Sequence, residues 1–113
     1  MAGIRIDDSV SWIVAGWVHS FTVELLLKHL SPEAPEELRK ALRADEESGL
    51  HFLSLPSLGS RSASEILRTL KHIVVLLESG EEPFGTASAL PAYLDRLREL
   101  MRLLQDASGP AKQ

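Results

Sequence analysis

The sequence predicts an all-α fold, a compact antiparallel four-helix bundle-like single domain. Four segments carry apolar residues at the 3-4 spacing of a helix, and proline or glycine separates each segment from the next. No stretch of useful length alternates apolar and polar residues as a half-buried strand would, and the expected links suit antiparallel neighbours. We expect this domain to span residues 1–107, and residues 108–113, which carry no apolar anchor, to form a flexible tail.

The first expected helix begins with Asp7 or Ser9 as its N-cap and continues to Ser31. Its main apolar stripe consists of Val10, Ile13, Val14, Trp17, Val18, Phe21 and Leu25. A second apolar set lies off this stripe and includes Trp12, Val23, Leu26 and Leu27. A helix that is apolar on most sides must be covered on most sides. It is therefore either the central helix of the domain, or the second set forms a two-fold interface between copies of the chain.

Residues 10–27 are apolar enough to be weighed as a membrane span. A span needs about 20 mostly apolar residues, and an acid at mid-span costs about 2.5–3.5 kcal/mol. Glu24 and several neutral polar side chains interrupt this stretch, which favours a buried helix. The N-terminal residues combine Arg5 with two aspartates and show no cleavage site after an apolar run, so they do not form a secretory signal. We expect a cytoplasmic protein that does not enter a membrane.

The second expected helix covers about Pro35 to Ser48, with Gly49 as its C-cap. Acids occupy both of its ends. Those at the positive N-terminal end are favourable and include Glu36 and Glu37. Those at the negative C-terminal end are unfavourable and consist of Asp45, Glu46 and Glu47. Such a local conflict favours a functional role for these acids.

Residues 50–60 form an unusually apolar connection. Pro56 and Gly59 break regular structure, so the segment is either a short extended piece or a turn of helix. Its apolar side chains either lie on the core or form an exposed patch that marks a binding site. In the second case Phe52, Leu53 and Leu55 are the expected anchors.

The third and fourth expected helices have clear boundaries. The third begins at a capping box formed by Ser62 and Glu65, and it ends before Gly80. The fourth begins near Ser88 with Pro91 in its first turn. Each carries one apolar stripe at the helical period, and these stripes supply most of the expected core.

The residue types that carry chemistry are not arranged for it. The chain has no cysteine, which excludes a thiolate nucleophile and a thiolate metal site. Its histidines lack the i,i+3 or i,i+4 spacing that two ligands on one helix face need. The serines of residues 54–64 lack both the nucleophile-elbow and the phosphate-loop patterns. We expect no catalytic residue, no metal and no cofactor; a ligand or enzyme site near His19 and Glu24 is a third alternative.

Charge favours a protein partner over nucleic acid. The net charge is −4 and the isoelectric point is near 5.5, which opposes binding to another polyanion. The link between the second and third helices is also too long for a helix-turn-helix. The whole negative surplus lies in residues 1–59, mostly around the second helix. It is either a solvated face or a docking surface that steers a basic partner.

We therefore expect a non-catalytic protein-binding module that recognises a basic surface on another protein. In size and charge the chain is similar to the immunity proteins that neutralise bacterial toxins, a likeness of general description that rests on no shared motif. The expected partner-binding residues are Glu36, Glu37, Asp45, Glu46, Glu47, Phe52, Leu53 and Leu55. The alternative is a homo-oligomeric structural protein, with a homodimer formed through Trp12, Val23, Leu26 and Leu27.

Overall fold

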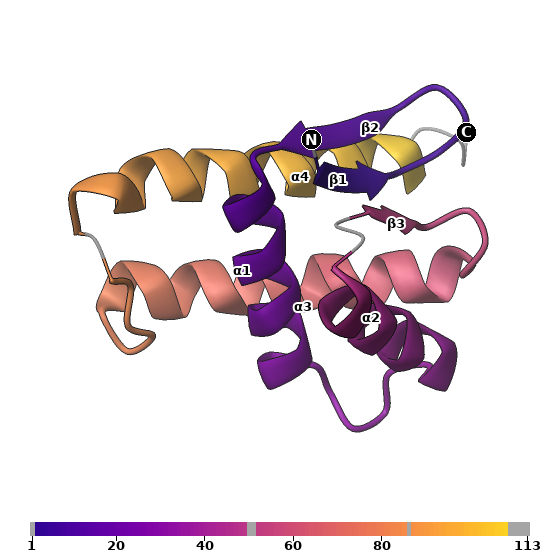
Figure 1. Ribbon diagram of the computed structural model, residues 1–113, viewed down its shortest axis with the longest axis horizontal. Helices are drawn as coiled ribbons and strands as arrows, with labels where there is room; N and C mark the ends of the chain where they lie inside the picture. The colour runs from indigo at the N-terminus through magenta and orange to yellow at the C-terminus, as the bar shows by residue number, and fades with distance from the viewer. Residues whose placement is uncertain (1, 50–51, 86, 109–113) are drawn as a thin grey trace.

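The computed structural model describes residues 2–49, 52–85 and 87–108 and shows four helices with a small sheet (Figure 1). The elements in chain order are β1 (Ala2–Arg5), β2 (Ser11–Val14), α1 (Gly16–His29), α2 (Glu36–Ser48), β3 (Phe52–Ser54), α3 (Ser60–Ser79), the short 3-10 helix η1 (Ala87–Ala89) and α4 (Leu90–Ser108). The expected all-α bundle is therefore wrong, because three strands pair into one mixed sheet and the fold is α/β.

The sheet has the strand order β2-β1-β3. Its middle strand, β1, pairs antiparallel with β2, where Ala2 lies opposite Val14, and parallel with β3, where Gly3 lies opposite Phe52. A Cβ atom at Gly3 would lie 1.9 Å from the carbonyl oxygen of Trp12. Only glycine therefore allows the two strands to approach this closely.

Residues 7–14 form a turn and a strand where the sequence predicts the start of a helix. Asp7 does not cap a helix: its Oδ1 accepts the backbone N–H groups of Ser9 at 2.8 Å and Val10 at 2.9 Å, which closes the β1–β2 turn. The strand alternates as a half-buried strand should, with Trp12 and Val14 inside and Ser11 and Ile13 outside. As a result α1 begins only at Gly16.

The remaining helices lie close to the predicted boundaries. Gly49 and Gly80 end α2 and α3 with φ angles of 71° and 85°, as expected of left-handed C-caps. The capping box at Ser62 is wrong, because α3 begins two residues earlier, at Ser60. The hydroxyl of Ser62 is buried without a hydrogen-bond partner in the described ranges, and Glu65 pairs with Arg68 instead.

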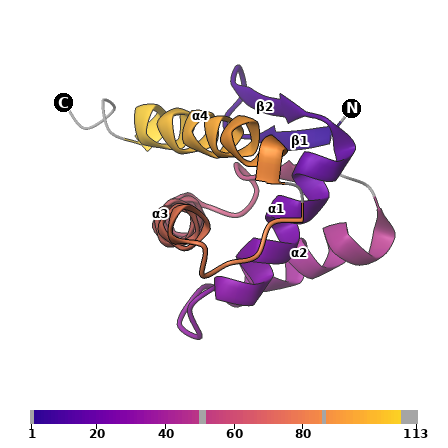
Figure 2. The same ribbon diagram turned by 90° about the vertical axis from the view of Figure 1, so that its left-hand side faces the viewer.

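The helices pack in two directions. Helices α3 and α4 run antiparallel, and α1 crosses this pair (Figure 1). Seen from the side, α1 lies between α3 and α2 (Figure 2). Each strand packs mainly on a different helix: β1 contacts α1, β2 contacts α4, and β3 contacts α2. None of the helices in the described ranges is long and apolar enough to cross a lipid bilayer.

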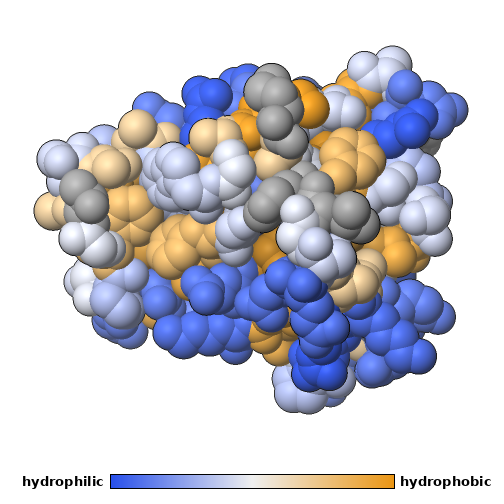
Figure 3. All heavy atoms as spheres, in the orientation of Figure 1, coloured by the Kyte–Doolittle hydropathy of each residue, from blue (hydrophilic) through white to orange (hydrophobic). Residues whose placement is uncertain are grey.

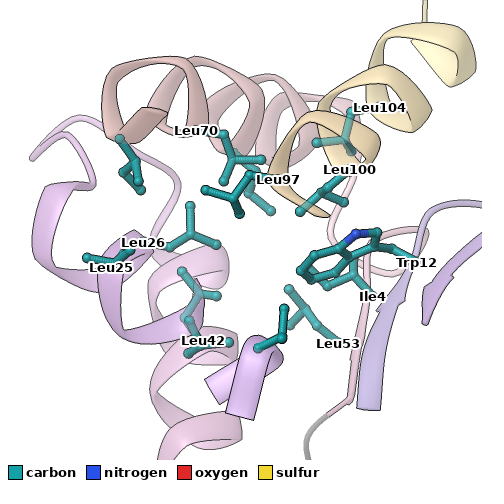
Figure 4. Packing of buried hydrophobic residues seen from close by; sticks show 14 of the residues in the cluster. Ile4, Trp12, Leu25, Leu26, Leu42, Leu53, Leu70, Leu97, Leu100 and Leu104 are labelled. Carbon is teal, nitrogen blue, oxygen red and sulfur yellow. The ribbon is translucent and has the colours of Figure 1, made fainter. Parts of the chain in front are cut away.

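The core fills the space between the sheet and the helices (Figure 4). Ile4, Trp12 and Leu53 enter it from the three strands, and Leu97 and Leu100 enter it from α4. The indole Nε1 of Trp12 donates a hydrogen bond of 2.9 Å to the backbone carbonyl of Arg96. This bond fixes β2 to α4, and it satisfies the one polar atom of a large buried side chain.

Candidate functional site: an aromatic surface centred on Trp17

Trp17 is the largest exposed hydrophobic side chain among the described residues. It lies in the first turn of α1, and 54% of its surface is accessible to solvent, far more than expected of an indole in a packed domain. Its ring stacks on that of Tyr93 in α4, with centroids 6.0 Å apart. Tyr93 also contacts Phe21 of α1 at 5.3 Å and Phe84 of the α3–α4 connection at 5.4 Å.

Tyr93 is the buried member of this aromatic group and contacts each of the other three rings. Its ring is buried, and its hydroxyl lies 2.7 Å from that of Thr22, which in turn donates to the backbone carbonyl of Val18 at 2.7 Å. Because the Thr22 proton is used in that bond, the Tyr93 hydroxyl is the donor to Thr22. Burial raises the pKa of the Tyr93 phenol well above its usual value, so the group stays neutral and keeps its proton. Trp17 therefore rests on a fixed platform.

Three hollows that open to solvent meet at Trp17. The first, of about 460 Å³, has apolar walls that include Phe21, Phe84 and Ala89. The second, of about 570 Å³, lies between β2 and α4 and includes Ile13. The third, of about 260 Å³, lies between α1 and the end of α2. Hydrophobic side chains gather between α1 and the α3–α4 connection on the face in Figure 3.

The third hollow differs from the others because three acids and no base line it, whereas the second has Asp95 beside Arg96. Trp17 and Phe21 form its apolar part, and Glu24, Asp45 and Glu46 supply three carboxylates. Glu24 and Glu46 are exposed to solvent, whereas Asp45 is almost fully buried. The position of Asp45 is fixed by His19 of α1, whose Nε2 lies 2.9 Å from Asp45 Oδ2. An ionised carboxylate can only accept, so Nε2 carries the proton of this bond.

The α3–α4 connection, which carries Phe84, is held to the end of α1 by one buried acid. The carboxylate of Glu82 is only 6% exposed, and it accepts hydrogen bonds from His29 at 2.7 Å and Lys28 at 3.0 Å. The bond from His29 and the charge and bond of Lys28 lower the pKa of Glu82 despite the opposing effect of burial. The rings of His72 on α3 and His29 pack in an edge-to-face arrangement, with centroids 5.7 Å apart.

The structure separates the acids that the sequence groups on the second helix. Glu46 borders the hollow beside Trp17, and Glu47 is exposed next to it. Glu36 and Glu37 are exposed at the other end of α2, about 15 Å away along the helix at 1.5 Å per residue. Asp45 is a buried partner of His19 rather than an exposed charge. The two groups of acids therefore do not form one site.

The expected apolar contact residues are mostly buried. Of the three expected anchors only Phe52 is exposed, at 48%. Leu53, in β3, and Leu55, directly after β3, are both buried in the core. Trp12, Val23 and Leu26, expected at an interface between copies, are also buried within the chain, and Leu27 is partly buried. The surplus apolar surface of the first helical segment is thus covered largely by the sheet and by the other helices.

Sequence reasoning misses Trp17, Phe21 and Phe84 as exposed or partly exposed residues. Trp17 and Phe21 fit the apolar stripe of the first expected helix, which predicts a core position for both. The available signal was Phe84, which lies between Pro83 and Gly85 in a connection that cannot be helical. An aromatic residue in such a place must pack on something nearby, and here it packs on Phe21 at 5.5 Å.

The described residues give no group of three histidine, aspartate or glutamate side chains that could hold a metal ion. The described histidines act instead within the packing: His19 bonds to Asp45, His29 bonds to Glu82, and His72 contacts the His29 ring. Comparison with protein-family models, with curated proteins and with solved structures finds no match. The functional argument therefore rests on the geometry of this chain.

Proposed function

We propose that this protein is a non-catalytic binding module that docks a basic segment of another protein onto the Trp17 surface. This surface consists of Ile13, Trp17, Phe21, Phe84 and Ala89. Glu24 and Glu46 border it at the hollow between α1 and α2, and Asp95 and Arg96 border it at the hollow between β2 and α4. The single observation that carries the proposal is the half-exposed indole of Trp17, which stacks on a buried tyrosine and borders three hollows.

The energetics of protein interfaces support this role. Tryptophan is the residue type most enriched among those that dominate binding energy, and a truncated hot spot costs about 2 kcal/mol or more. An aromatic group that is already fixed on its platform loses little conformational freedom on binding, so more of its contact energy contributes to affinity. A rim of acids raises the association rate with a basic partner. An inhibitor that covers a basic surface of another protein belongs to this class.

Affinity capture with matched variants tests the proposal. The bait is the full chain, and the comparison is between wild type, Trp17→Ala and Val75→Ala. Val75 is the control because it is an exposed apolar residue on α3 that lines none of the three hollows at Trp17. We expect a protein that wild type and Val75→Ala retain equally and that Trp17→Ala retains about 30-fold more weakly, from a loss of about 2 kcal/mol. Added salt should weaken its capture.

Two outcomes contradict the proposal. One is that Trp17→Ala retains every protein that wild type retains. The other is that wild-type bait captures nothing beyond an unrelated acidic bait of similar size. Sedimentation of the free protein provides a further check: a Trp17-dependent increase in mass with concentration identifies the occupant as a second copy of the chain, which also contradicts a basic partner protein.

A further inference from the structure

We infer that the acid-lined hollow between α1 and α2 is a binding pocket for an arginine side chain of the partner. This pocket, called the Arg pocket below, is lined by Trp17, Ser20, Phe21, Val23, Glu24, Asp45 and Glu46. The inference rests on the proposed docking function and names the chemistry that the partner must carry. It follows from three properties of the pocket: its walls, its charges and its size.

The walls suit a planar cation. A guanidinium group stacks on the face of an aromatic ring, and tryptophan gives the strongest such contact. Trp17 is exposed and Phe21 is half-buried, and both line this pocket from α1. The stacking of Trp17 on Tyr93 holds its ring in place, so the ring is not free to collapse into the pocket. A partner side chain can therefore use the remaining indole surface.

The charges of the pocket match the same ligand. Three of its seven lining residues are acids and none is basic, so a cation that enters meets no competing positive group among them. Asp45 is held in place by the bond from its Oδ2 to His19. A guanidinium has five N–H donors in a fixed fork, which lets it pair with carboxylates while its flat face covers an aromatic ring. A lysine ammonium ion carries the charge but lacks the flat face.

The pocket also has a suitable size. Its volume of about 260 Å³ is smaller than the range of about 300–1,000 Å³ typical of sites for drug-sized ligands. It therefore suits one long side chain rather than a whole small molecule. Trp17 also borders the two neighbouring hollows, so residues next to the arginine would contact them.

The test uses the two indole N–H signals as reporters in nitrogen-edited NMR spectra of the labelled full chain. Trp17 borders the pocket, whereas Trp12 is buried with its Nε1 bonded to Arg96, so Trp12 is an internal control. The probes are the acetylated, amide-capped forms of arginine, citrulline and lysine. Citrulline has nearly the shape of arginine but no charge. We expect arginine to move the Trp17 signal in a saturable way, with Trp12 unchanged, and citrulline and lysine to bind at least about fivefold more weakly.

Variants of the acids then locate the effect. We expect Glu46→Gln and Glu24→Gln each to weaken arginine binding about threefold to fivefold, as loss of one partly exposed charge at short range should. Glu47→Gln is the matched control, because it removes the adjacent exposed acid that does not line the pocket, and it should leave the affinity unchanged. Unchanged circular dichroism spectra confirm that the variants are folded.

The inference is overturned if citrulline moves the Trp17 signal as strongly as arginine, if arginine gives no saturable shift, or if Glu47→Gln acts like Glu46→Gln. The docking proposal fails separately. Should capture of a partner depend on Trp17 while arginine and citrulline bind alike, the Trp17 surface remains a docking site and only the arginine assignment is lost. Should arginine bind while capture does not depend on Trp17, the docking proposal is lost.

Discussion

His19 and Asp45 form a buried bridge between the first two helices, with 2.9 Å between Nε2 and Oδ2 and almost no exposed surface on either side chain. Asp45 lies in the last turn of α2, where a negative charge is unfavourable towards the helix dipole. His19 on α1 offsets this local penalty, because burying a hydrogen-bonded carboxylate costs far less free energy than burying an unpaired one. The bridge also supports one wall of the Arg pocket.

Removal of the carboxylate should destabilise the fold. We expect Asp45→Ala to lower the free energy of unfolding by about 3 kcal/mol, since it removes the buried carboxylate that accepts the bond from His19 Nε2 and opens a cavity. Glu46→Ala, one residue further on and exposed, should change it by about 0.5 kcal/mol or less. Urea denaturation followed by circular dichroism measures both values. Equal stability of Asp45→Ala and Glu46→Ala would show that the bridge contributes nothing.

Glu82 should make the stability depend on acid. The pKa of Glu82 in the fold lies below its ordinary value of 4.5, chiefly because of the bond from His29. Because its pKa is lowered, Glu82 stabilises the fold at pH values above 4.5. This contribution is lost as the pH falls below 4.5 towards the pKa of Glu82 in the fold. We expect Glu82→Gln to cost about 1–2 kcal/mol at neutral pH, because a charge-assisted bond is lost.

The pH dependence distinguishes this effect from simple loss of packing. The difference in free energy of unfolding between wild type and Glu82→Gln should shrink as the pH falls below 4.5. Glu81→Gln, an exposed neighbour, should follow the wild-type curve throughout. A constant difference between wild type and Glu82→Gln over the acid range would argue against a role for the ionised carboxylate.

Gly3 should tolerate no side chain. A Cβ atom there would lie 1.9 Å from the Trp12 carbonyl oxygen, which belongs to the backbone of the paired strand and cannot move aside cheaply. We expect Gly3→Ala to destabilise the protein by about 3 kcal/mol or to prevent folding, because severe steric overlap is among the causes of the largest effects of single substitutions. Gly16→Ala is the control, because nothing lies within 4 Å of a Cβ atom at that position. Thermal unfolding compares the two variants.

The two tryptophans should differ sharply in fluorescence. In Trp17→Phe the remaining indole, Trp12, is buried, so its emission should be blue-shifted and shielded from acrylamide. In Trp12→Phe the remaining indole, Trp17, should be red-shifted and readily quenched. This comparison also tests the β1–β2 hairpin directly, because Trp12 is buried through its place on the inner face of β2. Similar quenching of both variants would contradict the strand.

Three helices could be predicted from the sequence because their end signals are local. Pro35, Gly49 and Gly80 act through their own backbone geometry, and the apolar stripes of α3 and α4 run long enough to show their period. The boundary at Ser62 was wrong by two residues, since Gly59 with its φ of 91° already lets the helix begin at Ser60.

The sheet could not be predicted in the same way because its strands are very short. Trp12, Ile13 and Val14 fit the helical spacing with Trp17 as well as they fit four residues of strand alternation. The middle strand, Ala-Gly-Ile-Arg, shows no alternation, since its first three residues are buried between its two neighbours. What decides both strands is pairing with residues far away in the chain, such as Gly3 with Phe52.

The sequence identifies part of the candidate site. The acids at the end of the second helix were identified, and Glu46 does border the surface we propose. The sequence does not identify Trp17, the apolar residue that shares the hollow with Glu46, because Trp17 fits the apolar stripe of the first expected helix. Starting α1 at Gly16 instead of near Val10 places Trp17 in the first turn, beyond the cover of the sheet. The failure to predict β2 and the failure to predict an exposed Trp17 therefore have the same cause, a first helix that was expected to begin too early.

The position of β1 makes residues 2–5 structurally indispensable. Chain ends are usually the safest places to shorten a protein, since few contacts depend on them. Here that segment supplies the only hydrogen-bonded neighbour that either β2 or β3 has within the described sheet. Deleting it would leave two strands with no common partner and would uncover Trp12 and Leu53 together, so even a trim of a few residues at this end should expose apolar surface and favour aggregation.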